Sequence, residues 1–178
     1  MNQILQYFKG RLTFSQFLTI LAEATIPIQA WAFYTLFEDL KVLLQDYNLS
    51  ESWATWSYTF FYVIIDVLVL TVFVVIPLYL IPKQFIRGRY VEIGLLNILV
   101  IILTAILIKF NASLFDHIDI FFWALVLFVF FISAITSRIP PKILAILAGI
   151  AERLVVLAFL FWAIDILGLI TIFLRNFI

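Results

Sequence analysis

Apolar residues along this chain gather into five long segments that are separated by short polar turns. The segments cover residues 17–37, 56–82, 93–110, 118–136 and 143–174. A helix that crosses the hydrocarbon core of a bilayer needs about 20 mostly apolar residues, and each segment meets or approaches that length. The pattern predicts an all-α fold, a polytopic transmembrane helical bundle of about five spans, with four spans as the alternative.

The last segment is too long to be a single upright span. A continuous helix from Pro141 to Leu174 would be about 50 Å long, against roughly 30 Å of hydrocarbon. Glu152 and Arg153 interrupt its apolar sequence. We therefore expect residues 154–174 to form the fifth span and residues 141–153 to form a cytoplasmic or interfacial helix extension. Whether residues 141–174 make one helix or two segments stays open at this point.

The remaining segments fit one membrane domain that covers residues 1–178. Residues 1–16 alternate apolar and polar positions in a way that suits a short interfacial helix. Residues 38–47 keep a helical period and are expected to extend the first span. No internal repeat or low-complexity linker divides the chain.

The composition excludes an ordinary water-soluble domain. Hydrophobic residues make up 66% of the chain and charged residues 12%, whereas soluble domains carry roughly a quarter charged residues. The mean hydropathy is +1.19. The formal net charge is zero, so no overall field attracts nucleic acid. The chain has no cysteine, which excludes disulfides and thiolate metal sites. We also expect the first apolar segment to be a retained span, because it carries Glu23 and lacks a signal-peptide cleavage pattern.

The charges outside the segments are distributed unequally between the two ends of the predicted bundle. Basic residues precede the first segment, lie between the second and third, and follow the fourth: Lys9, Arg11, Lys83, Arg87, Arg89, Arg138 and Lys142. Acidic residues dominate the other turns. The positive-inside rule then places the N-terminus in the cytoplasm, and we expect an integral protein of a bacterial inner (plasma) membrane. Anionic lipid headgroups explain the cytoplasmic basic turn formed by Lys83, Arg87 and Arg89, with docking of a soluble partner as the alternative.

Polar residues inside the segments are the main candidates for function: Glu23, Asp66, Asp165, Tyr62 and Asn97. A charged side chain at the centre of a spanning helix costs about 2.5–3.5 kcal/mol on insertion scales, so such residues usually face a bundle interior or a wet cavity. One interpretation is a proton or cation pathway through Asp66 and Asp165. The other is neutral hydrogen-bonding contacts between helices. We expect both side chains to face the interior in either case, and Asp66 to be a neutral hydrogen-bonding acid on one stripe with Tyr62 and Thr59.

Charged and small residues near the interface are further candidates. Glu152 and Arg153 are adjacent and point to different faces, so Glu92 and Glu23 are predicted partners for Arg153, against a solvated rim as the alternative. Ala145 and Gly149 form a small-xxx-small step that allows close helix packing.

The chain lacks the usual sequence signatures of catalysis. No HExxH motif, glycine-rich phosphate loop or Ser/His/Asp set is present, and His117 is its single histidine. We predict no catalytic residue, no metal site and no cofactor.

One part of the chain resembles a known family. Residues 60–134 contain an Asp-bearing span, the basic turn FIRGRY, the run VEIGLLNILVIILTAILI and a short acidic loop. This order is similar to that of the phosphate-starvation-inducible E family of small membrane proteins. The resemblance implies four spans and no defined biochemical activity, and the fifth segment departs from that pattern. Size and span number are also similar to those of small membrane components of bacterial anti-phage systems, by analogy of architecture alone.

These observations predict a non-enzymatic membrane-embedded sensor, anchor or scaffold subunit of an oligomeric assembly. The expected partners are the lipid bilayer, further copies of the chain and a soluble cytoplasmic protein, with no direct binding of nucleic acid. The alternative is a small proton- or ion-conducting protein that depolarises the membrane, as an anti-phage defence component would.

Overall fold

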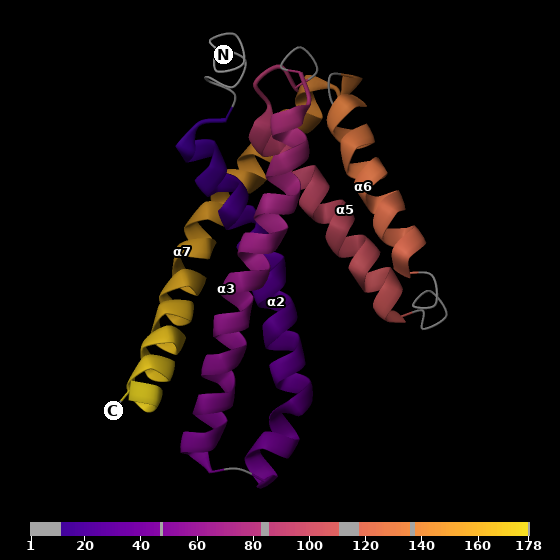
Figure 1. Cartoon of the computed structure of the whole chain (residues 1–178). Helices are drawn as coiled ribbons and strands as arrows, with labels where there is room; N and C mark the ends of the chain where they lie inside the picture. The colour runs from indigo at the N-terminus through magenta and orange to yellow at the C-terminus, as the bar shows by residue number, and fades with distance from the viewer. Residues whose placement is uncertain (1–11, 47, 83–85, 111–117, 136–137, 178) are drawn as a thin grey trace.

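The protein is all-α throughout the part of the chain that its structure describes. A computed structural model describes residues 12–46, 48–82, 86–110, 118–135 and 138–177. Its helices are α2 (Phe14–Asp46), α3 (Leu49–Leu80), α5 (Tyr90–Phe110), α6 (Ile118–Ile135) and α7 (Pro141–Phe177) (Figure 1). No strand occurs within these ranges, and the predicted fold class is confirmed.

Four of the helices are long and apolar enough to cross a membrane. The qualifying stretches are Phe14–Leu40, Glu51–Leu80, Tyr90–Phe110 and Pro141–Phe177. The apolar part of α6, Phe122–Ile135, is shorter. The chain is therefore an integral membrane protein with four helices of spanning length and one shorter apolar helix.

The helix ends follow from local sequence chemistry. Helix α2 continues to Asp46, as the helical period of residues 38–47 predicts. The next helix starts with a capping box, in which the Asn48 side chain accepts from the Glu51 backbone N–H at 2.9 Å and the Glu51 side chain accepts from the Asn48 N–H at 3.1 Å. Before α5, Arg87 and Gly88 both have positive φ, 52° and 78°, and so reverse the chain.

Helix α7 resolves the question that its sequence leaves open. Residues Pro141–Phe177 form one continuous helix of 37 residues, which is about 55 Å long at 1.5 Å per residue. The predicted extension 141–153 and the predicted span 154–174 are thus parts of one element. Most of the predicted interfacial segment 1–16 lies outside the described residues, and α2 begins at Phe14.

The helices diverge from one end of the molecule. The start of α2, the turn before α5 and the start of α7 lie together at the top of Figure 1, which we call the basic end because Arg87, Arg89, Arg138 and Lys142 lie there. From this end α2 and α3 run side by side, α7 leans to one side, and the α5–α6 hairpin leans to the other (Figure 1). The basic turns thus share one end, and the membrane side that this end faces stays a prediction.

Helix α2 lies at the centre of the packing. Its buried Ile20, Ala24 and Ala32 belong to one core with apolar residues of α3 and α5. A second small core joins Leu95 of α5 to Leu144 and Leu147 of α7. In a bilayer these contacts stabilise the bundle mainly through close van der Waals packing, because lipid tails are as apolar as the side chains.

Candidate functional site: an acidic pocket and buried polar pairs

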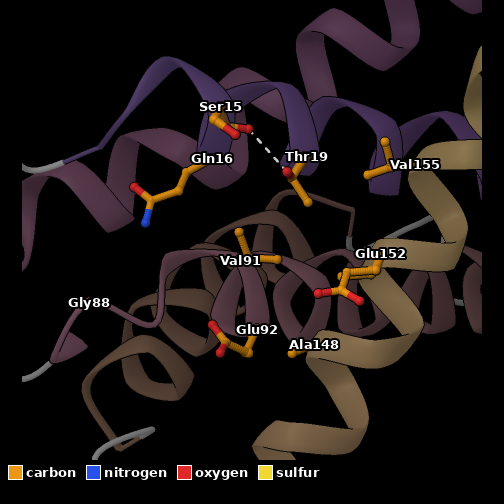
Figure 2. A pocket seen from close by; sticks show the side chains of 10 residues that line it. Ser15, Gln16, Thr19, Gly88, Val91, Glu92, Ala148, Glu152 and Val155 are labelled. Carbon is orange, nitrogen blue, oxygen red and sulfur yellow. Dashed lines mark hydrogen bonds between the residues drawn. The ribbon is translucent and has the colours of Figure 1, made fainter.

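A polar pocket of about 450 Å³ opens at the basic end, between α2, α5 and α7. It is lined by Ser15, Gln16, Thr19, Gly88, Val91, Glu92, Ala148, Ala151, Glu152 and Val155 (Figure 2). We call it the acidic pocket. The small side chains of Ala148 and Ala151 on α7 leave this volume unfilled, while α2 contributes hydroxyl and amide groups to its wall. The pocket can therefore hold water or a polar ligand at the end of an otherwise apolar bundle.

Two carboxylates reach the acidic pocket from different helices. Glu92 comes from the first turn of α5, and Glu152 extends from α7 into the space beside Val91 (Figure 2). The ion pair in the described part of the chain joins Lys109 and Glu38, whose Nζ and Oε2 lie 3.8 Å apart. Within that part, neither pocket carboxylate is neutralised by an ion pair.

Glu23 lies one helical turn deeper than the pocket residue Thr19. Its side chain is completely buried, and neither carboxyl oxygen has a hydrogen-bond partner among the described residues. A Cβ placed on Gly94 of α5 would lie 3.4 Å from Glu23 Oε2, and Glu23 interacts electrostatically with Glu92. Burying an ionised carboxylate without a donor or counter-ion is expensive, so this position fits the neutral acid.

The predicted pairing of Arg153 with Glu92 or Glu23 is wrong for the described part of the chain. Arg153 is exposed and forms no ion pair there. The physical reason is its position on α7: Glu152 takes the pocket-facing side, and the adjacent residue is turned by about 100° about the helix axis. The alternative interpretation of a solvated rim therefore holds for Arg153.

Asp165 forms the best-defined polar contact inside the bundle. Its Oδ1 accepts a hydrogen bond from Gln29 Nε2 at 2.6 Å, and Asp165 is only 2% exposed. One turn away, Trp162 Nε1 donates to Thr25 Oγ1 at 2.9 Å. These two bonds join α2 to α7 at successive turns. The interior orientation predicted for Asp165 is confirmed, with Gln29 as its partner.

Sequence reasoning missed Gln29, although a signal for it exists. Thr25 and Gln29 are polar positions four residues apart in an apolar run, the spacing that puts both on one helix face. Trp162 and Asp165 repeat that arrangement three residues apart on α7. Matching such pairs between helices identifies this contact.

Asn97 serves a contact between α5 and α6. Its Nδ2 donates to Ser133 Oγ at 3.0 Å, and the Ser133 hydroxyl donates to the Val129 carbonyl at 2.8 Å. Both Asn97 and Ser133 are completely buried. This candidate is accounted for by helix packing.

The interior orientation predicted for Asp66 is wrong. Asp66 is exposed, and Tyr62 on the same stripe is 61% exposed. Asp66 instead lines a hollow of about 240 Å³ between α2, α3 and α5. The buried face of α3 carries Val63, Val67 and Leu70. Asp66 lies at the edge of that face, about 60° from Val63 about the helix axis, so it borders the core without being buried.

The remaining candidates lie on the surface or outside the described residues. Ala145 is exposed, and a Cβ on Gly149 would point into open space, so this small-residue step is not buried in the described part of the chain. Arg87 is exposed, and Lys83 lies outside the described residues. The described residues also contain no group of three or more His, Asp or Glu placed to hold a metal ion.

Comparison with known proteins places the chain in no family. No family model, no curated protein and no solved structure matches it. The resemblance to the phosphate-starvation-inducible E family stays a prediction.

Proposed function

We propose that this protein is a non-enzymatic, membrane-embedded sensor subunit that responds to protons or small cations entering the acidic pocket. The single observation that carries the proposal is Glu23, a completely buried carboxyl group whose two oxygens have no partner in the described structure. It lies one helical turn below a pocket that offers the carboxylates Glu92 and Glu152, neither of which forms an ion pair with another described residue. A group in this position changes charge only if its surroundings change with it.

The proposed response follows from the physics of burial. When Glu23 is neutral, α2 packs closely on α5, since Gly94 removes the side chain that would otherwise separate them. When Glu23 ionises, it requires water or a cation, and the acidic pocket is the nearest source of both. Ionisation therefore opens the pocket toward Glu23 and loosens the contact between α2 and α5.

Thiol labelling tests this response in a chain that has no cysteine of its own. Val91→Cys places a thiol in the pocket, and Arg138→Cys provides an exposed reference at the same end. The ratio of their labelling rates removes the pH dependence that the two thiols share, and comparison with the Glu23→Gln background removes the part that belongs to the pocket thiol alone. We expect the ratio to rise severalfold more with increasing pH in the chain that keeps Glu23 than in the chain that carries Glu23→Gln.

Glu38→Gln is the matched control, because it neutralises an exposed carboxylate in the ion pair with Lys109, away from the pocket. It should leave the pH dependence of the ratio unchanged. A ratio that varies identically with and without Glu23→Gln would contradict the proposal.

Self-association is part of the same proposal. The exposed step formed by Ala145 and Gly149 on α7 supports it, since a small-residue face allows another helix to approach closely. Native mass spectrometry in mild detergent should give an oligomer, and Gly149→Phe should reduce it to the monomer. A monomer in every detergent would contradict this part.

Proton conduction is a second candidate, favoured by the polar pairs that follow one another through the bundle. The Thr25–Trp162 and Gln29–Asp165 contacts are followed by Trp53, which donates to Thr171 at 3.2 Å. Proton flux into liposomes that Asp165→Asn abolishes would support conduction over sensing.

A further inference from the structure

The hollow beside Asp66 is separate from the acidic pocket, and neither proposed function uses it. It lies between the middle parts of α2, α3 and α5, with Pro27, Trp31, Ile102 and Ile106 among its lining residues. Asp66 lies at the middle of the Glu51–Leu80 stretch of α3. The hollow therefore lies near the centre of the membrane, where no bulk water dissolves a charge.

Asp66 is the one charged group among the described residues that line this hollow. It is exposed, and it forms no hydrogen bond or ion pair with any other part of the chain that the structure describes. The remaining lining residues are apolar side chains and the Trp31 indole. An acid without a protein partner in an apolar hollow matches a ligand that is itself apolar except for one positive charge.

We propose that this hollow binds a lipophilic monocation of the quaternary or tertiary ammonium class, with Asp66 as its counter-ion. The ammonium head lies against the Asp66 carboxylate, and its hydrocarbon part contacts Trp31, Ile102 and Ile106. A charged pair that forms in a low-dielectric site is held more strongly than one in water. Such a ligand enters from the lipid, in which its apolar part dissolves.

The other charged groups near the hollow adjoin Trp31. The Lys109 Nζ lies 4.2 Å from the centroid of the Trp31 ring and 3.8 Å from Glu38 Oε2. Glu38 offsets the Lys109 charge, and Lys109 already takes a cation–π position on that ring. The ligand's charge is therefore matched to Asp66, and Trp31 serves as an apolar wall.

The volume limits the size of the charged head. A hollow of about 240 Å³ accommodates a trimethylammonium head with a benzyl group, whereas bulkier tails must extend out of the hollow into the lipid. Binding to the neutral acid also releases one proton from Asp66 to solvent. Affinity should therefore fall as the pH is lowered.

The test measures binding of benzyltrimethylammonium to the full chain in phosphatidylcholine nanodiscs by isothermal titration calorimetry. We expect one ion per chain, and at least a tenfold loss of affinity in Asp66→Asn. The matched control is Asp165→Asn, which alters the other mid-membrane aspartate and should leave the affinity unchanged. Neopentylbenzene, the uncharged isostere of the probe, should not compete.

Two further results decide the proposal if Asp66→Asn does not fold. Ile102→Trp fills the hollow and should abolish binding while Asp66 is retained, and binding that survives would contradict the site. The competing occupant is a second copy of the chain. Disulfide cross-linking of Ile106→Cys between two copies, with no probe bound to the unmodified chain, would assign the hollow to that copy and overturn the proposal.

Discussion

Alanine substitution at three helical glycines measures how closely the helices of this protein pack. A Cβ on Gly94 would lie 2.9 Å from Ile20 Cγ1, and one on Gly168 would lie 3.1 Å from Phe60 Cβ. A Cβ on Gly149 would meet nothing within 4 Å. The same chemical change therefore meets three different surroundings.

The expected magnitudes follow from two opposing effects. Alanine is favoured over glycine in a helix interior by about 1 kcal/mol, and this gain applies at all three positions. Forcing an extra group into a packed core costs about 1–3 kcal/mol. Ile20 is completely buried and β-branched, so its Cγ1 cannot rotate away. Gly94→Ala should therefore be less stable than Gly149→Ala by about 1–3 kcal/mol, with Gly168→Ala between them.

The assay is the free energy of unfolding in mixed micelles, from titration with dodecyl sulfate followed by circular dichroism. A double-mutant cycle isolates the contact, because Ile20→Ala removes the obstructing Cγ1. In that background Gly94→Ala should behave like Gly149→Ala. Equal stabilities of Gly94→Ala and Gly149→Ala in the unmodified chain would refute the close α2–α5 crossing.

Two other changes test the buried contact and the topology. Gln29→Leu removes the donor to Asp165 and should lower the free energy of unfolding by about 1–2 kcal/mol. Glu38→Gln at the exposed ion pair should lower it by less than about 1 kcal/mol. Equal losses of stability would contradict the burial of the Gln29–Asp165 contact. A thiol at Arg138→Cys should be protected from an impermeant reagent added outside cells, while one at Glu51→Cys should react, and the reverse result would invert the predicted orientation.

The helices were predictable because membrane insertion imposes a strong and local constraint. A spanning helix must be apolar over about 20 residues, so a continuous apolar run in the sequence indicates its length and its approximate ends. The continuity of α7 was not predictable, because Glu152 and Arg153 are compatible both with a break between two segments and with one helix that carries this charged pair at the membrane interface. In the structure Leu95 of α5 packs on Leu144 and Leu147 of α7, a contact that the sequence of α7 alone does not reveal.

The candidate site was only partly predictable, because orientation about a helix axis depends on neighbouring helices. The sequence identified Asp165 and Asp66 as equivalent mid-membrane acids. In the structure the first is held by Gln29, while the second lies beside the buried face of α3 and lines a hollow between α2, α3 and α5. Periodicity shows which residues share a face, but not which face the rest of the bundle covers.

The length of α7 makes the tilt of this helix depend on the thickness of the bilayer. A helix of 37 residues exceeds the hydrocarbon thickness by roughly 25 Å if it stands upright, so it meets a thinner membrane by tilting further. Ala148 and Glu152, near the basic end of the same helix, form one wall of the acidic pocket. Tilting of α7 moves this wall relative to α2 and α5. The width of the acidic pocket therefore depends on the chain length of the surrounding lipids.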